Sequence, residues 1–215
     1  MDPNSPRARG KDQRRSRLIR AARDLITERE DGNFSMQELA TRAGLSLATP
    51  YNLLGSKASI LQEVYRAETE GFRRANKAVE SKPPAERIMA TADHAVDVFS
   101  RSPKFYRNLS RSLSTLGSDE LRQLINPLTD VMLQPLVEEL TAEGAIEIAI
   151  SPAVITSQLQ HIFESIYARW AALDWSEAHF RKQLRTGFAL IFLGLFKGKN
   201  RDALIAELIA LEMQL

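Results

Sequence analysis

Apolar residues recur at intervals of three and four along almost the whole chain, and this spacing constrains the fold more than any other feature. The clearest runs are Leu18, Ala22, Leu25 and Ile26; Ile60, Leu61 and Val64; and Ile155, Leu159, Ile162, Ile166 and Trp170. Such intervals place side chains on one face of an α-helix. No stretch combines sustained two-residue alternation with flanking turn signals, so we predict no strand. The sequence therefore predicts an all-α protein of about nine or ten helices.

Serine, glycine and proline mark where these helices begin and end. Ser35 and Glu38 have the spacing of a capping box, and Gly44 follows the helix that it opens. Ser151-Pro152 and Asn126-Pro127 each pair an N-cap with a proline at the first helical position, and Pro135 is expected to kink its helix. The predicted helices are 12–30, 36–43, 47–53 with Ser46 as cap, 57–78 with Ser56 as cap, 84–101, 103–115, a broken segment 118–143, 152–173, 176–197 ended by Gly198, and 201–213.

Residues 35–54 have the form of a helix-turn-helix, with a capped helix, a tight turn and a second helix. Ala40 is small where the helices would cross, and Gly44 can adopt the positive φ that the turn needs. In such a unit the second helix enters the major groove, and its first residues meet the base edges. Asn52 could bond adenine, and Thr49 and the apolar side chains could contact a thymine methyl.

The charge is concentrated at one end of the chain. The net charge of all 215 residues is only +2. Residues 1–23, however, hold eight basic and two acidic side chains, a net charge of +6, whereas residues 61–215 carry −2. A basic arm before a helix-turn-helix attracts polyanions, and nucleic acid is the leading candidate. A solubilising tail is the alternative.

The stretch from Phe34 to Ser46 (FSMQELATRAGLS), followed by Thr49 to Lys57 (TPYNLLGSK) and Leu61, resembles the TetR family of transcriptional repressors. The resemblance implies that Tyr51 and Lys57 bind operator phosphates and that the basic arm reaches a minor groove. The full set of predicted DNA contacts is Arg14, Arg17, Ser35, Arg42, Ser46, Leu47, Ala48, Thr49, Tyr51, Asn52 and Lys57.

Two positions depart from the family pattern. Leu54 replaces the usual phenylalanine, which we expect to leave docking unchanged. Pro50 lies inside the second helix, where we expect it to remove an early hydrogen bond and alter the tilt of the helix. That helix is also poor in arginine, so positioning would depend on the arm and on DNA shape.

The segment Ser81-Lys82-Pro83-Pro84 is the predicted boundary between a DNA-binding domain, residues 1–80, and a helical effector-binding and dimerisation domain, residues 81–215. The resemblance implies both functions of the second domain. Helices 152–173 and 176–197 also have more apolar surface than one partner needs, which favours a two-fold dimer on a palindromic operator. The predicted dimer contacts are Ile155, Leu159, Ile162, Ile166, Leu184, Phe188, Ile191 and Leu195.

Aromatic, histidine and methionine side chains in the second domain are candidates for a mostly apolar effector pocket, although at helical spacing they are more typical of a core. The candidates are His94, Phe99, Tyr106, Met132, His161, Tyr167 and Trp170. We expect an elongated hydrophobic or aromatic effector whose binding releases a repressor from DNA.

Enzymes and membrane proteins are poorly supported alternatives. The chain has no cysteine, no Gly-x-Gly-x-x-Gly, no P-loop and no paired histidines, so we predict no catalytic residue, metal or cofactor. Its longest apolar run, residues 188–196, is far below the roughly 20 residues of a membrane span. We expect a cytoplasmic protein without a membrane partner; a helical adaptor whose arm binds an acidic protein or surface stays an alternative.

Overall fold

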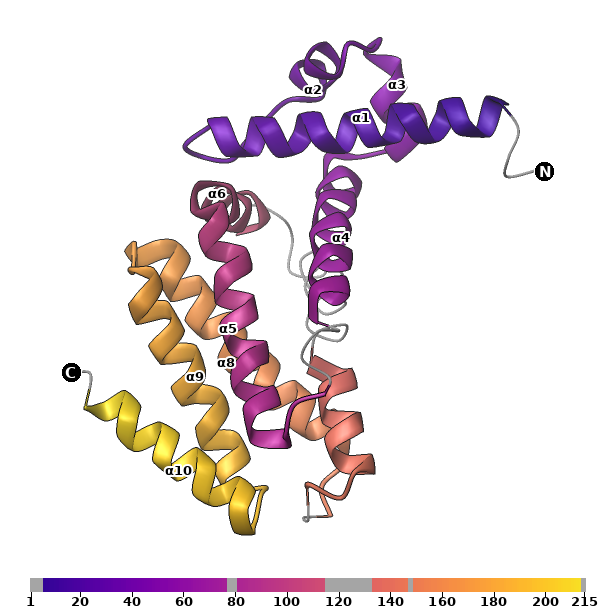
Figure 1. The fold of residues 1–215 in the computed structure, drawn as a ribbon. Helices are drawn as coiled ribbons and strands as arrows, with labels where there is room; N and C mark the ends of the chain where they lie inside the picture. The colour runs from indigo at the N-terminus through magenta and orange to yellow at the C-terminus, as the bar shows by residue number, and fades with distance from the viewer. Residues whose placement is uncertain (1–5, 77–80, 115–132, 147–148, 214–215) are drawn as a thin grey trace. The chain divides into compact units, whose positions relative to one another are not determined.

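The computed structural model of the chain describes residues 6–76, 81–114, 133–146 and 149–213 (Figure 1). Within these residues every regular element is a helix, which confirms the all-α prediction. In chain order the helices are α1 (Pro6–Glu28), α2 (Met36–Ala43), α3 (Ala48–Leu54), α4 (Lys57–Asn76), α5 (Pro84–Arg101), α6 (Pro103–Ser114), a helix over 133–142, α8 (Pro152–Leu173), α9 (Glu177–Leu193) and α10 (Gly198–Glu212).

The helices gather into two compact units. The first contains α1 to α3, α4 as far as Glu68, and α6, whereas the second contains α5, α8, α9, α10 and the helix over 133–142. The predicted boundary lay between residues 80 and 81. Helix α6 follows that boundary in the sequence, but it belongs to the first unit. The reason is its packing against α1, which lies more than 70 residues earlier in the chain.

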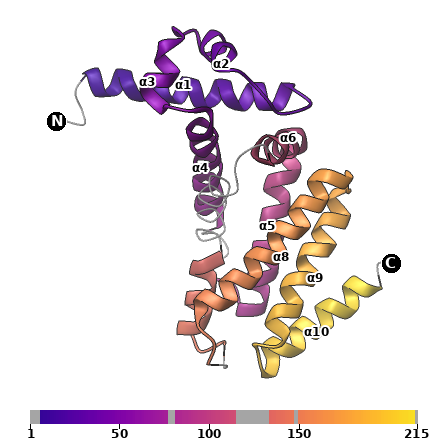
Figure 2. The same ribbon diagram turned by 180° about the vertical axis from the view of Figure 1, so that it is seen from behind.

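In the first unit, α2 and α3 lie on one side of α1 and α4 leads away from the other side (Figures 1 and 2). Leu18, Ala22 and Ile26 are fully buried on α1, as the apolar spacing predicted. Phe105 of α6 is also fully buried, with the guanidinium of Arg23 4.3 Å above its ring. These buried contacts hold α1, the helix against which α2 and α3 pack.

In the second unit, α8 and α9 form a helical hairpin, and α5 and α10 both pack against α9 (Figure 2). Gly187 allows the close crossing within the hairpin, because a Cβ at this position would lie 2.7 Å from the side chain of Ile162. At the other side of α9, Arg181 donates to Asp93 and Asp97 of α5 at 3.1 and 2.6 Å. The helices of this unit are thus joined by both apolar and ionic contacts.

Several predicted helix ends were wrong. Helix α1 begins at Pro6 rather than near residue 12, so much of the basic arm is helical. Helix α9 ends at Leu193, and Gly198 begins α10 instead of ending α9. The chain turns at Gly194, and the consecutive side chains of Leu195 and Phe196 are both buried there. Of the segment 118–143, Pro127 and Met132 lie outside the described residues.

Candidate nucleic-acid interface

Helix α2 begins at a capping box and ends at a left-handed glycine, both as predicted. The Glu38 amide donates to Ser35 Oγ at 3.2 Å, and the Ser35 amide donates to Glu38 Oε2 at 2.8 Å. At the other end Gly44 has a φ of 61°, and its amide donates to the carbonyl oxygens of Ala40 and Thr41. Two defined helix ends fix the angle at which the chain leaves α2 and enters α3.

Helix α3 begins at Ala48, and the loss of a hydrogen bond expected at Pro50 does not occur. Pro50 is the third residue of the helix, within the first turn, where backbone amides have no partner inside a helix. Its ring is buried, so the proline packs against the unit and costs no hydrogen bond. The predicted cap, Ser46, instead places its hydroxyl 2.9 Å from the hydroxyl of Thr49, and Leu47 occupies the N-cap position with helical dihedrals.

One face of α3 is exposed and carries no charge. Leu47 and Tyr51 are both 52% exposed, and Ala48 and Asn52 are exposed beside them. These positions form two pairs four residues apart, so they lie together on one side of the helix. The sequence of α3, ATPYNLL, contains no acidic or basic residue. The four side chains are suited to contacting base edges by apolar packing and by one amide.

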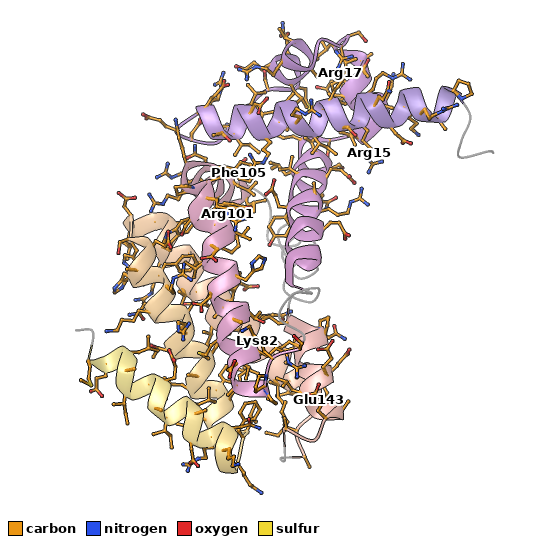
Figure 3. The ribbon with its side chains drawn as sticks, viewed as in Figure 1. Arg15, Arg17, Lys82, Arg101, Phe105 and Glu143 are labelled. Carbon is orange, nitrogen blue, oxygen red and sulfur yellow. The ribbon has the colours of Figure 1, made fainter. Side chains whose placement is uncertain are left out.

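Two of the predicted DNA-contacting arginines are bonded within the unit. Arg17 donates to the carbonyl oxygens of Ala43 and Gly44 at 2.5 and 3.2 Å, so it ties α1 to the end of α2. Arg42 donates to both carboxylate oxygens of Glu28 at 2.7 and 2.5 Å, and these hydrogen bonds lower the pKa of Glu28. Figure 3 shows Arg17 on the side of α1 that carries α2, opposite Arg15. Arg17 and Arg42 each join α1 to α2, so they position the helix-turn-helix.

Lys57, the predicted phosphate ligand, lies at the first position of α4. Its ammonium group donates to Asn33 Oδ1 and lies 5.0 Å from the centre of the Phe34 ring. Partial burial lowers the pKa of Lys57. The ammonium group has three N–H donors, so it can bind a phosphate and keep its hydrogen bond to Asn33.

The first turns of α1 carry exposed positive charge. Arg9, Lys11 and Arg14 are exposed, and no ion pair joins them to any described residue. Arg15, in contrast, is paired with Glu63 of α4 at 2.5 Å. Over these residues the basic arm is part of helix α1.

A groove of about 310 Å³ between α1 and α2 contains a cation that the sequence analysis missed. Arg20 lines this groove beside Asp24 and Thr41, together with Arg17 and Arg42. Arg20 belongs to the basic run of residues 14–23. The spacing of the basic residues in this run does not reveal that Arg20 faces α2. Its exposed guanidinium adds to the positive surface of the unit.

Comparison with known proteins then places this architecture among solved structures. No family model and no curated protein matches the sequence. A Thermus thermophilus FadR, described as a TetR-family transcriptional repressor in complex with lauroyl-CoA, aligns over 86% of this chain and 96% of its own, with a TM-score of 0.71 and 18% identity. The Bacillus subtilis FadR in complex with stearoyl-CoA aligns over 84% of this chain and 98% of its own, with a TM-score of 0.68 and 16% identity.

SmeT, the repressor of the multidrug efflux pump SmeDEF of Stenotrophomonas maltophilia, aligns over 86% of this chain and 92% of its own, with a TM-score of 0.65 and 11% identity. These proteins share an arrangement of helices with this chain over nearly their whole lengths. The chain has the TetR fold. At these identities the likeness concerns the fold, and the roles of individual residues have to be argued from their own surroundings.

In this TetR-fold chain, five of the eight predicted dimer contacts are covered by their own unit. Ile155, Leu159, Leu184 and Phe188 are buried within a single copy, as is Leu195, whereas Ile162, Ile166 and Ile191 are partly exposed. The largest apolar side chains that face outward on α8 and α9 are instead Val154, Leu173 and Leu190. The helical spacing identified the apolar faces but not which of them the monomer itself covers.

Three of the predicted effector-binding residues lie in one aromatic cluster. Phe99, Tyr167 and Trp170 meet in an aromatic cluster with Phe163 and Phe180, in which the rings of Trp170 and Phe180 stack with centroids 5.0 Å apart. Burial raises the pKa of Tyr167. The cluster is a packed core between α5, α8 and α9.

The other candidates for effector binding are outside this aromatic cluster or outside the described residues. Tyr106 is in the first unit, where its hydroxyl donates to Glu68 at 2.6 Å. His161 is exposed on α8, His94 is half-buried on α5, and Met132 lies outside the described residues. The groove found in the second unit, about 270 Å³ between α5, α9 and α10, is lined by Lys82, Glu86, Asp93, Arg185 and Glu207 and is thus more charged than the expected pocket.

Two further features concern only the part of the chain that the structure describes. None of its helices is long and apolar enough to cross a membrane. No group of three or more histidine or acidic side chains there is arranged to hold a metal ion.

Proposed function

We propose that this protein is a TetR-like one-component transcriptional regulator, a repressor that binds a palindromic operator as a homodimer and is released by a small, largely hydrophobic effector. The observation that supports DNA binding best is the exposed face of α3, held at a fixed angle by the capping box of Ser35 and the left-handed turn at Gly44. The TetR fold of the whole chain supports the same function.

The residues of the first unit have three roles in this proposal. Leu47, Ala48 and Asn52 contact bases, and Ser46 and Thr49 support the start of α3 through their paired hydroxyls. Tyr51 and Lys57 contact phosphates, and exposed cations of α1, Arg14 among them, add sequence-independent attraction. Arg17, Ser35 and Arg42 position the helices, because their polar groups are already bonded inside the unit.

DNA binding is assigned to residues 1–80, and effector binding and dimerisation to residues 81–215. Helix α6 belongs to the second segment in sequence but packs on α1. Dimerisation is assigned to the outward sides of α8 and α9, where Leu190 and Val154 are exposed and Ile162 and Ile166 are half-buried. Two such faces from two copies would bury apolar side chains that one copy leaves in water.

The effector is proposed to be an elongated hydrophobic molecule, and a fatty acyl thioester is the first compound class to test. Two proteins that share the fold are described in complex with lauroyl-CoA and stearoyl-CoA. The aromatic cluster around Phe99 is filled in this structure, so an acyl chain would have to enter elsewhere in the second unit or displace these rings.

Binding to DNA can be tested with the full-length protein and duplexes from the region upstream of its own gene. We expect nanomolar binding to one palindromic fragment, a steep loss of affinity with added salt, and protection of two half-sites about 34–36 Å apart. Failure to bind any fragment at low salt would contradict the proposal. Acyl-CoA esters of different chain lengths, scored by thermal shift and by release of the bound fragment, then test the effector.

A further inference from the structure

We infer that this protein reads its DNA site through the 5-methyl groups of thymines, with Leu47 as the residue that discriminates between bases. The inference rests on the proposed function, since it names the base chemistry that fits the exposed face of α3. It is carried by the exposure of Leu47, by the absence of charge from α3, and by the internal bonds of the neighbouring cations.

Leu47 is an apolar side chain left in water at the position where a recognition helix meets base edges. It is 52% exposed, and its φ of −55° and ψ of −33° continue the helix backwards by one residue. It therefore lies one turn before Tyr51 on the same side, with Ala48 next to it. Contact with an apolar group on DNA would remove this surface from water.

Thymine is the base that offers such a group. In the major groove guanine presents two acceptors, cytosine a donor and adenine one of each, while thymine presents a methyl group beside its acceptor. An exposed leucine gains nothing from the polar edges and gains burial from the methyl. Asn52, exposed on the same side of α3, can pair with adenine through its amide, so both side chains favour A·T pairs.

The commonest specific contact, arginine or lysine to guanine, is not offered by this helix. Residues 48–54 contain no cation. Arg17 is bonded to two backbone carbonyls and Arg42 to Glu28, so both guanidinium groups are directed into the unit. The hydroxyl of Thr49 lies against that of Ser46. Leu47 and Asn52 are thus the side chains of this face best placed to tell one base pair from another.

The test compares thymine with deoxyuridine, which differs from it only by the absent methyl group. Duplexes are first selected from a random pool with the wild-type protein, and each enriched thymine is then replaced by deoxyuridine in turn. One buried methyl is worth about 0.8 kcal/mol, so we expect about fourfold weaker binding at each thymine that Leu47 contacts and no change elsewhere.

Two variants assign the effect to Leu47. In Leu47→Ala the ratio of the two dissociation constants should fall to about one, while Leu47→Met, which keeps the apolar reach, should retain most of the discrimination. Leu173→Ala, at an exposed leucine of the second unit, is the matched control and should leave the ratio as in the wild type.

The outcomes separate this inference from the function on which it rests. Selection of a palindrome whose affinity is the same with thymine and deoxyuridine would overturn the inference and leave the function standing. Discrimination that survives in Leu47→Ala would overturn the role of Leu47. If no duplex is enriched at all, the proposed function fails and the inference fails with it.

Discussion

The side-chain amide of Asn108, in the middle of α6, donates to the backbone carbonyl oxygen of Ile26 at 3.0 Å. The same nitrogen donates to Arg29 at 2.6 Å, and Arg111, one turn further along α6, donates to the carbonyl of Glu30 at 2.7 Å. These side chains cap the last turn of α1, whose carbonyl groups have no partner within their own helix. The end of α1 is therefore held by a helix that follows it by about 80 residues.

Asn108→Ala should destabilise the first unit, because it leaves a buried carbonyl without a donor. The expected loss in the free energy of unfolding is about 1–3 kcal/mol. Denaturant unfolding followed by circular dichroism measures it. Lys104→Ala is the control, since Lys104 is exposed and its contact with the carbonyl of Glu28, at 3.5 Å, is long. Equal stability of Asn108→Ala and the wild type would contradict the capping role.

Gly32→Ala should be more damaging than the same change at Gly10. Gly32 has a φ of +64°, and a Cβ there would lie 2.2 Å from the backbone oxygen of Asn108. The strained dihedral and the clash together should cost about 2–5 kcal/mol. Nothing lies within 4 Å of a Cβ on Gly10, inside α1, so alanine there should add about 0.5–1 kcal/mol of helix stability. Thermal unfolding of the two variants should shift in opposite directions.

Arg14→Ala should reduce the salt dependence of DNA binding. If Arg14 of each copy contacts a phosphate, the homodimer loses two contacts, and the slope of log K against log salt concentration should become shallower by about 1.8. Arg23→Ala is the matched control: Arg23 is bonded to Glu68 at 2.8 Å, so its loss should lower stability and leave the slope unchanged. Fluorescence anisotropy with the selected duplex at several salt concentrations gives both slopes. An unchanged slope for Arg14→Ala would remove this residue from the interface.

The stability of the second unit should fall as the pH drops below about 6.5, the ordinary pKa of histidine. Burial lowers the pKa of His94. The carboxylate of Asp97, which is bonded to Arg181, acts in the opposite direction, whereas the positive charge of Arg101 lowers the pKa further. The unfolded chain then binds a proton at a pH where the folded chain does not, so acid favours unfolding and the contribution is regained as the pH rises. Urea unfolding between about pH 5 and pH 8 measures this slope.

His94→Gln should flatten the part of that slope that comes from His94. His161→Gln, at an exposed histidine of α8, should leave it in place. An identical pH dependence of His94→Gln and the wild type would show that the stability change has another source.

Leu190→Asp should disrupt the proposed homodimer. Leu190 is 56% exposed on α9, so a carboxylate there is tolerated by one copy but would be buried without a partner between two copies. Light scattering after gel filtration should give a monomer for this variant and a dimer for Leu47→Asp, which changes an exposed leucine of the first unit. A dimeric Leu190→Asp would move the interface away from this face.

Local signals were sufficient to predict most of the helices. Ser35 with Glu38, and Ser151 with Pro152, act on the backbone next to them, and α2, α5 and α8 begin and end where such signals place them. The start of α1 was missed because its first turns have no apolar periodicity. The end of α9 was missed because Gly198 could equally follow one helix or open the next.

The candidate interface was predictable in outline but not in its bonds. The sequence places Leu47 and Asn52 on α3, and the structure has both exposed. The sequence cannot reveal that Arg17 donates to a carbonyl 26 residues away, because a long side chain finds its partner only after the helices have packed. The effector pocket was even less predictable from the sequence, since rings such as Phe99 and Trp170 have the same spacing in a packed core as in a cavity.

The internal bonding of Arg15, Arg17, Arg23 and Arg42 has a kinetic consequence for the proposed regulator, which would have to search a genome. Affinity for random DNA depends on cations that can trade counterions for phosphates, and an arginine held by a carboxylate or a carbonyl contributes little to that exchange. Most encounters with non-operator sequence would thus be brief, depending chiefly on Arg9, Lys11, Arg14 and Arg20. Long residence would require the uncharged face of α3 to find its matching bases.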